Sequence, residues 1–538
     1  MRKLLLPLFI CFFYSQNFCA QEFLHIGSHV IPLSNVTKIT SSVRVHPKSL
    51  SLLLEADGKI SIYVSALKAT GMIDTITHYI DKSYQILNVE DSCRWNNVYV
   101  PGPGAPGASY LNVAFPEERR LNFTFFTCPD SILKTKYQIT NLDGLRKKAK
   151  EIYSKVYPED ANVTDETDRR NYLNRFISYQ LLSFCGMYNT LTGVDGDKLA
   201  NNFDRMNVSI ADWYETMMPY SIIKFSVPDY QRNIYINRRT GANSRPDDRG
   251  VRVLGVKVLL PTHGPEHSDA INGAYHYIDD IVAYDKNTQE VVLDERIRFD
   301  CTTLSPDFMT KLTDGETARG HSAANNGKYT SGNDNHSVAL KSGFVRNFEF
   351  DKESSVIVSN RSISSSLYQG DMVALKGMFD VKVKLPPVPA GTYELRLGYA
   401  ALTSNGIVAF YIDGEPMDIV DLRQDAQEQF NWKSDDMYLY SEEEIADFER
   451  SARNKGWMKG PASYSRNNGR AFDESNSLRN NSFCMRKIIG TFTTDGKSEH
   501  FLRLQQQMPN GESTMAFDYI ELVPASVYDS EEYQENKW

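Results

Sequence analysis

The sequence predicts an α+β half followed by an all-β sandwich that one helix interrupts. Three observations lead to this prediction. Helical spacing of apolar residues is found mainly in the first half, strict alternation of apolar and polar residues recurs after position 378, and Gly or Pro turns separate the alternating runs. The 538 residues are enough for about three or four domains, or for two enlarged ones.

Helices are predicted in the first half where apolar residues recur three and four positions apart. The expected ranges are 61–70, 140–156 (opened by a capping box of Thr140 and Asp143), 165–182, and a short helix over 209–218. Runs of β-branched and aromatic residues predict strands over 121–127, 221–227, 252–260 and 274–282. Two polar or Pro/Gly-rich stretches, 101–107 and 237–250, are predicted to be loops inserted into this first domain, which spans residues 40–290.

The second half alternates apolar and polar residues with the period of a β-strand. The expected strands cover 379–385, 393–399, 408–412, 489–493, 502–504 and 517–523. A helix is predicted over 442–455, because Ser441 and Glu444 have the spacing of a capping box. We therefore expect an antiparallel sandwich over residues 295–526, followed by an acidic tail over 527–538.

The first residues have the composition of a secretory signal peptide. Arg2 and Lys3 precede an apolar run over residues 4–14, and the small residue Ala20 closes the segment. This run is too short to span a bilayer, and no later segment approaches about 18 apolar residues, so no transmembrane span is expected. We predict that residues 1–20 are removed on export, with a lipid anchor at Cys19 as the alternative.

Charge and composition exclude two classes of protein. Lys and Arg total 59 against 68 Asp and Glu, which gives a net charge of −9, and no basic block occurs. A protein that binds nucleic acid through phosphate contacts needs the opposite balance, so no nucleic-acid partner is expected. The hydrophobic fraction of 41% and the charged fraction of 24% are ordinary for a folded protein and exclude wholesale disorder.

The motifs that suggest catalysis or cofactor binding have simpler explanations. The glycines of 102–107 match the spacing of a dinucleotide fingerprint, but prolines fill the motif and no helix follows to receive a pyrophosphate. A Gly-Pro pair separates His263 from His267 and prevents the helix that would aim both at one metal. Asp279 and Asp280 are adjacent in a predicted strand and point to opposite faces. We therefore expect no catalytic residue, no metal and no cofactor.

Aromatic side chains are the remaining candidates for binding chemistry. Trp432, Trp457 and Tyr464 lie in polar stretches of the second half that have neither helical nor strand periodicity. Exposed rings bind sugars by stacking on their apolar faces, while nearby polar groups hydrogen-bond the hydroxyls. These three rings are the predicted ligand-binding residues, and burial in the core or at its rim is the alternative for each.

Four segments of the first half resemble, in order, the conserved parts of the fasciclin domain. They are the helix over 62–76, the strand over 123–130, the helix over 176–182 and the Asn-Gly-Ala-Tyr-His-Tyr-Ile-Asp string over 272–279. Gln180 stands where the family usually has His. The resemblance implies one enlarged fasciclin-like domain over 40–290, and it implies contacts with proteins or carbohydrates.

Two further resemblances concern the cellular location of the protein and the fold of its second half. Longer phrases such as 212–219 and 456–464 are similar to exported fasciclin-domain proteins of Gram-negative gut anaerobes, which implies an envelope location and an association with glycan uptake. Segments 388–399, 410–416 and 517–524 resemble galactose-binding-like jelly rolls, a group that includes carbohydrate-binding modules.

These features predict a non-enzymatic interaction protein of the cell envelope, at the outer-membrane surface or in the periplasm. It is expected to act in adhesion or glycan capture as an accessory to a polysaccharide-uptake system. Its expected partners are a glycan, an envelope or matrix protein, and outer-membrane glycan-uptake components. Two alternatives remain. One is a glycan-acting hydrolase or lyase with its acid and base on separated strands, and the other is a structural assembly subunit that binds a protein partner.

Overall fold

β-Strands make up most of the regular structure, and the longer helices lie within residues 50–179 and 442–454. The computed structural model describes residues 23–26, 29–32, 48–84, 96–99, 110–114, 119–186, 188, 191, 212–226, 233–238, 255–260, 270–313, 316–317, 335–340, 342–351, 354–361, 368, 371–401, 405–423, 430–461, 478–508 and 514–531. The predicted signal peptide over 1–20 lies outside these ranges.

Residues 1–48 and 49–538 form two separate units. The described part of the first unit is an antiparallel hairpin of β1 (Phe23–Ile26) and β2 (His29–Pro32). All elements below belong to the second unit.

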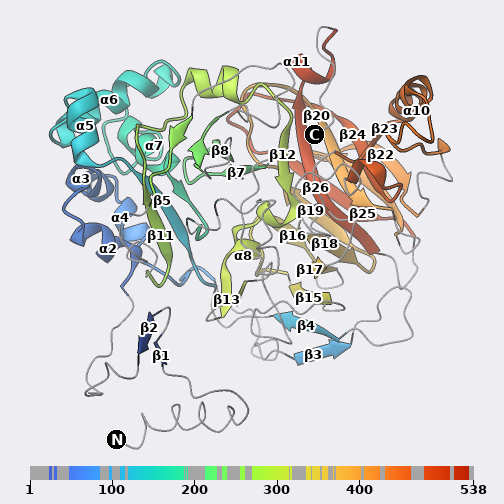
Figure 1. Ribbon diagram of the computed structural model, residues 1–538, viewed down its shortest axis with the longest axis horizontal. Helices are drawn as coiled ribbons and strands as arrows, with labels where there is room; N and C mark the ends of the chain where they lie inside the picture. Colours follow the sequence, from blue (N-terminus) through green and yellow to red (C-terminus); the bar gives the residue numbers. More distant parts are fainter. Residues whose placement is uncertain are drawn as a thin grey trace, which may run out of the picture. The chain divides into compact units, whose positions relative to one another are not determined.

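The helices of the first half gather at one end of the second unit (Figure 1). They are α2 (Leu50–Ala56), α3 (Ser61–Ala69), α4 (Met72–Thr75), α5 (Asp130–Tyr137), α6 (Leu142–Tyr153) and α7 (Tyr172–Tyr179), with a short 3₁₀ turn at Pro158–Asp160. Helix α3 confirms the prediction for 61–70, because Ile62, Ala66 and Leu67 are all buried on one face. Helix α6 is capped by Asn141, whose side chain accepts a hydrogen bond from the Gly144 N–H at 3.0 Å. The predicted capping box at Thr140 is therefore wrong by one residue.

The predicted helix over 165–182 is too long. Helix α7 starts after Asn171, whose side chain accepts from the Leu173 N–H at 2.9 Å and so satisfies one of the free donors of the first turn. It ends before Gln180, and strand β6 (Leu181–Leu182) follows at once. The apolar run 181–182 is thus used for sheet pairing, which periodicity cannot distinguish from a buried helical turn.

The predicted helix over 209–218 is wrong, because residues 213–215 form a strand. Strand β7 (Trp213–Glu215) pairs antiparallel with β8 (Ile222–Ser226). The pairing buries Trp213 and Tyr214, which are 0% and 2% exposed. Burial of two aromatic side chains in a hairpin outweighs a local capping signal.

Two small sheets also belong to the first half. Strand β5 (Phe123–Thr127) pairs in parallel with β11 (Gly273–Tyr277) and antiparallel with β6. The other sheet has the order β10 (Val256–Lys257), β9 (Tyr235–Ile236), β8, β7. Gly273 is required beside β5, since a Cβ at this position would lie 2.3 Å from the Phe123 carbonyl oxygen.

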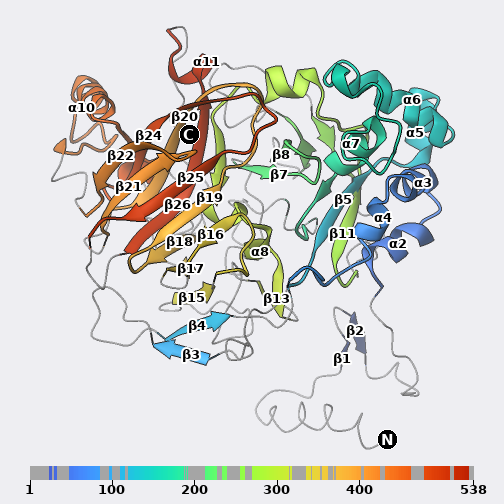
Figure 2. The same cartoon turned by 180° about the vertical axis from the view of Figure 1, so that it is seen from behind.

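The second half is a β-rich sandwich of two sheets (Figures 1 and 2). The larger sheet runs β23 (Trp457–Lys459), β24 (Cys484–Thr494), β20 (Gly391–Ala400), β26 (Thr514–Pro524), β18 (Asp371–Lys376), β17 (Ser355–Arg361), β15 (Asn335–Leu340), β4 (Tyr110–Ala114), β3 (Asn96–Tyr99), and β12 (Ile297–Asp300) also pairs with β26. The smaller sheet runs β16 (Phe348–Phe350), β19 (Asp380–Lys384), β25 (Phe501–Gln506), β21 (Ile407–Ile412), β22 (Glu415–Asp421). The described pairings in these sheets are antiparallel except β15 with β4. The largest sheet therefore also contains two strands from the first half of the sequence.

Short elements complete the described part of the second half. They are the pair β13 (Lys311–Thr313) and β14 (Glu316–Thr317), the helices α8 (Pro306–Met309) and α11 (Ala525–Tyr528), and 3₁₀ turns at Cys301–Thr303 and Leu478–Asn480.

The one long helix predicted in this half is present as α10 (Glu442–Asn454). Its capping box is complete, because the Ser441 and Glu444 side chains each bond the other's backbone N–H.

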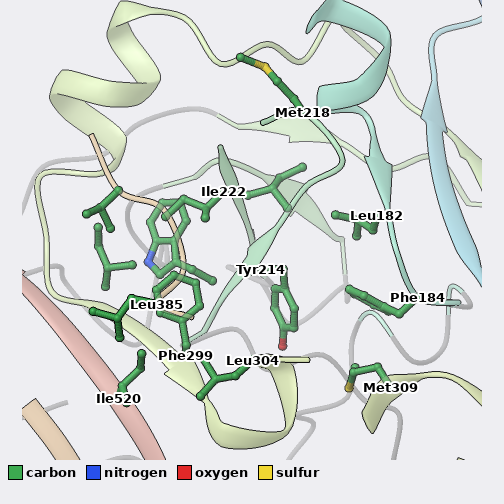
Figure 3. Packing of buried hydrophobic residues seen from close by; sticks show 14 of the residues in the cluster. Leu182, Phe184, Tyr214, Met218, Ile222, Phe299, Leu304, Met309, Leu385 and Ile520 are labelled. Atoms are coloured by element: carbon green, nitrogen blue, oxygen red, sulfur yellow. The ribbon is translucent and has the colours of Figure 1, made fainter. Parts of the chain in front are cut away.

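A continuous apolar core joins the two halves. It includes Tyr214 and Ile222 of the β7–β8 hairpin together with Phe299 of β12, Leu385 after β19 and Ile520 of β26. Figure 3 shows these side chains in one cluster. The hairpin that carries Glu215 is therefore anchored against the sandwich.

Candidate functional site

Of the three predicted ring residues, the structure describes Trp432 and Trp457, and these two do not form an exposed platform. Trp457 begins β23, is 6% exposed, and has Tyr399 and Phe430 against it with ring centroids 5.7 Å away in each case. Trp432 is half-buried and packs against the core. Tyr464 lies outside the described residues. The alternative of a core or rim position thus describes both tryptophans, because two rings pack against Trp457 and Trp432 is partly buried against the core.

Replacing Trp457 by Ala is expected to lower the free energy of unfolding by about 3–5 kcal/mol, because a buried aromatic side chain is deleted from a packed site. The matched control is Tyr438→Ala, since Tyr438 is fully exposed. Urea unfolding of both variants measures the difference. A Trp457→Ala protein as stable as the control would contradict the burial of this ring.

A pocket of about 120 Å³ opens where the β7–β8 hairpin meets the sandwich. We call it the seam pocket. It is lined by Glu215, Pro219, Tyr220, Lys384, Leu385, Pro386, Pro387, Val388, Phe492, Thr494, Ser498, Glu499 and His500. Glu215 ends β7, Lys384 ends β19, and Glu499 and His500 lead into β25. The β19–β25 pairing places Lys384 opposite Phe501, and Glu499 and His500 directly precede Phe501 in the chain.

Two carboxylates in the seam pocket contact the same ammonium group. The Lys384 Nζ lies 2.8 Å from Glu499 Oε1 and 3.9 Å from Glu215 Oε1. The distance between the two carboxylate oxygens therefore cannot exceed the sum of these two values. That limit covers the spacing of about 5–5.5 Å between the carboxyl groups of retaining glycosidases.

The two carboxylates have different surroundings. The side chain of Glu499 is 49% exposed, whereas that of Glu215, at the end of β7, is 35% exposed. Burial raises the pKa of Glu215 above its usual value, Lys384 lowers it, and the charge of Glu499 raises it further, with a net upward shift. Although burial lowers the pKa of Lys384, its two carboxylate neighbours raise it overall, so the ammonium keeps its proton.

The turn beside Glu215 is strained and well braced. Tyr220 has φ 60°, a left-handed conformation that is rare for a bulky residue. Buried hydrogen bonds hold this turn, because the Thr216 N–H donates to Ser221 O at 3.1 Å and the two hydroxyl oxygens lie 2.6 Å apart. Such strain persists where the surrounding structure enforces it, and it is concentrated at functional sites.

Rings and prolines form the walls of the seam pocket. The His500 ring lies 5.0 Å from the Phe492 ring, centroid to centroid, and its Nδ1 is 2.6 Å from Asp413 Oδ2. Pro386 and Pro387 follow Lys384 and also face the cavity. The pocket thus combines a carboxylate pair with apolar surfaces, which are the two elements that a saccharide site requires.

Sequence reasoning missed this site for a local reason. The pattern over 209–218 predicts a helix, in which Glu215 has no relation to Lys384 or Glu499. The alternation over 379–385 correctly predicts the strand that Lys384 ends, but no local pattern shows which strands become neighbours. An assignment of Trp213 and Tyr214 to a strand would have been the available signal.

A larger cluster of charge is buried in the sandwich and is unsuited to bind a substrate. Glu521 of β26 is 0% exposed, and four guanidinium groups lie within 4 Å of its carboxylate. They belong to Arg296, Arg298, Arg396 and Arg486. We call this group the arginine cluster, and its role is structural.

The described residues contain neither a metal-binding cluster nor a helix that could span a membrane. Among the described residues, no set of three or more His, Cys, Asp and Glu side chains could hold a metal ion. Within the same ranges, no helix has the length and hydropathy needed to cross a bilayer.

Comparisons with known proteins show no family for this chain. No family model matches it, and no curated protein matches it. Three solved structures share weak likeness. A Paenibacillus xanthan lyase is 14% identical over 31% of this chain and 11% of its own, with a TM-score of 0.18. The insecticidal crystal protein Cry2Aa is 11% identical over 36% and 22% of the two chains, with a TM-score of 0.18. The catalytic domain of a GH87 α-1,3-glucanase, solved with tetrasaccharides, is 12% identical over 33% and 26%, with a TM-score of 0.17.

These neighbours correct one expectation. Two of the three are a glycan lyase and a glucanase, so the prediction that this chain is not an enzyme is contradicted and is not carried further. The match spans between 11% and 26% of the length of these solved structures. Likeness of this degree transfers no residue and no reaction to this chain. The resemblance to fasciclin domains remains a prediction.

Proposed function

We propose that this protein is a glycan-acting enzyme that uses Glu215 and Glu499 of the seam pocket as its acid and base. The observation that carries the proposal is the convergence of two carboxylates on the Lys384 ammonium inside a cavity. Glu215 ends β7 and Glu499 precedes β25, so the two carboxylates come from segments far apart in the sequence.

The reaction that fits this pair is hydrolysis of a glycosidic bond. Glu215 is the carboxyl group whose proton is favoured, so it donates a proton to the leaving glycosidic oxygen as the bond from the anomeric carbon breaks. Glu499 acts on the opposite side, where it either attacks the anomeric carbon or takes a proton from the attacking water. Lys384 orients Glu499 and lowers the pKa of Glu215.

Elimination fits the pocket less well. A lyase must neutralise the carboxylate of its uronic acid substrate before a base removes the neighbouring carbon-bound proton. Lys384 is the one Lys or Arg that lines the seam pocket among the described residues, and it is already paired with Glu499 at 2.8 Å.

The setting of this activity rests on the sequence alone. We propose that the chain is exported to the cell envelope, that its first half has a fasciclin-like fold, and that its second half is a galactose-binding-like jelly roll. Adhesion, glycan capture and association with glycan-uptake components remain compatible with an enzyme that holds its substrate at the envelope.

The test is turnover of a panel of neutral and acidic polysaccharides by the full chain. Release of reducing ends measures cleavage of either kind, and the ultraviolet absorbance of unsaturated products measures the part that is elimination. Reducing ends that appear with the wild type without unsaturated products, and that do not appear with the double variant Glu215→Gln/Glu499→Gln, support the proposal. Equal turnover by the two proteins contradicts it, and so does a lack of turnover across the panel.

A further inference from the structure

A second and larger cavity of about 430 Å³ lies in the first half. The end of α5, one face of α6, strands β9 and β10, and the segment 281–292 form its walls. We call it the lysine groove. None of its lining residues belongs to the seam pocket. Its volume is within the range of about 300–1,000 Å³ that ligand sites occupy.

The wall of the lysine groove is apolar on several sides. The side chains that form this part are Ile152, Ile236, Val256, Ile281 and Val292. Tyr137 adds a ring whose hydroxyl group donates to Asp280 Oδ1, which fixes the ring. A ligand with an apolar face can therefore be held against fixed surfaces.

The charged residues of the groove leave an excess of positive charge. Lys148 is paired with Glu151 at 3.2 Å and lies 5.1 Å from the centre of the Tyr137 ring. Lys155 and Lys286 are exposed lining residues for which no ion pair is found in the described ranges. The carboxylate of Asp285 already accepts a hydrogen bond from the Thr288 N–H at 2.8 Å.

The segment beside Lys286 has a rare and braced backbone. Residues Thr288–Val292 form a π-helical turn. The Leu293 N–H donates to Thr288 O at 3.0 Å, and the Thr288 hydroxyl donates to Ala283 O at 3.0 Å. π-Helical turns are uncommon and are frequently found at functional sites. Here Thr288 and Val292 both face the groove.

We propose that the lysine groove is an accessory binding site for a sugar acid. The carboxylate of the ligand is bound by Lys155 and Lys286, and its apolar ring face lies on the wall formed around Ile152 and Val292. The choice of a saccharide rests on the proposed function. The requirement for an anion with an apolar face rests on the groove alone.

The test is calorimetric titration of the full chain with digalacturonic acid. Its dimethyl ester is the uncharged counterpart. In the double variant Lys155→Met/Lys286→Met the affinity for the acid is expected to fall about tenfold or more, because two charged hydrogen-bond donors are lost. The matched control is Lys147→Met/Lys150→Met, which removes two exposed lysines of the same region that do not line the groove. All four altered side chains are exposed, so the melting temperatures should stay equal.

The outcomes separate this proposal from the proposed activity. Three results together support the groove, whether or not turnover is found. Of the two lysine variants, only Lys155→Met/Lys286→Met weakens binding of the acid, and the ester binds more weakly than the acid. Binding of the acid persists in Glu215→Gln/Glu499→Gln. Binding lost only in the Glu215→Gln/Glu499→Gln protein belongs to the seam pocket and overturns the groove. Equal losses in the two lysine variants, equal binding of the ester, or no binding also overturn it.

Discussion

Glu521→Gln is expected to lower the free energy of unfolding by about 3–5 kcal/mol, which is a large part of the stability of a typical domain. The substitution keeps the shape of the side chain and removes its charge. Four guanidinium groups of the arginine cluster then lose the carboxylate that they share. Removal of one member of a buried ionic group is costly because the remaining charges have already given up their water.

The geometry of the arginine cluster explains why this effect should be large. Arg298 donates to Glu521 Oε1 from Nε at 3.0 Å and from Nη2 at 2.9 Å, and Arg486 donates to Oε2 at 3.0 Å. Arg396 also donates to Glu394 at 2.6 Å, which links the cluster along β20. Glu521 belongs to β26, the strand that pairs with β12, β18 and β20, so its loss affects the centre of the larger sheet.

The same cluster predicts how the effect depends on pH. Burial by itself raises the pKa of Glu521, but the surrounding arginines lower it well below its usual value. A lowered folded-state pKa contributes stability that is complete above the unfolded-state pKa of about 4.3 and is lost as the pH falls toward the folded value. The stability difference between wild type and Glu521→Gln should therefore be constant near neutral pH and shrink in acid.

Urea unfolding at several pH values measures both effects. Glu443→Gln is the control, because Glu443 is an exposed residue in the first turn of α10. A loss below about 1 kcal/mol at neutral pH would match an ordinary surface ion pair and would refute the buried cluster. A difference that grows in acid would show that the pKa shift has the opposite sign.

The elements predicted correctly are those in which local pattern and burial agree. Helix α10 has its capping box and a buried face of Ile445, Phe448 and Ala452. Strand β19 shows alternating burial along its length, as the alternation over 379–385 predicts. The expected strand over 408–412 lies within β21, and the Asp413-Gly414 turn that follows it has positive φ at both residues, as a tight hairpin requires.

The elements predicted wrongly are those in which distant contacts decide the structure. The segment 209–218 has a helix-like start, yet Trp213 and Tyr214 gain more by packing in a hairpin that contacts the sandwich. Trp457 lies in a polar stretch, yet β23 pairs with β24 and buries it. The seam pocket depends on the β19–β25 pairing and on the packing of the β7–β8 hairpin against the sandwich, so its carboxylate pair could not be predicted from spacing along the chain.

Glu215→Gln is expected to reduce kcat/KM of the proposed hydrolysis by about 10²–10⁴-fold, because the proton donor to the leaving oxygen is lost. Activity should require protonated Glu215, so the rate falls as the pH rises through the pKa of this group. Lys384 lowers that pKa. In Lys384→Met the alkaline limb of the kcat/KM profile should therefore move to higher pH, even though the maximal rate falls.

The control for this shift is Lys382→Met on the same strand, since Lys382 pairs with Glu349 at 3.2 Å and does not line the seam pocket. Its pH profile should match that of the wild type. A limb that stays in place in Lys384→Met would mean that Glu215 is not the titrating acid. A limb that moves to lower pH would also contradict the assignment, because loss of a nearby cation raises the pKa of a carboxyl group. A limb that moves to higher pH in Lys384→Met, together with the loss of rate in Glu215→Gln, identifies Glu215 as the proton donor.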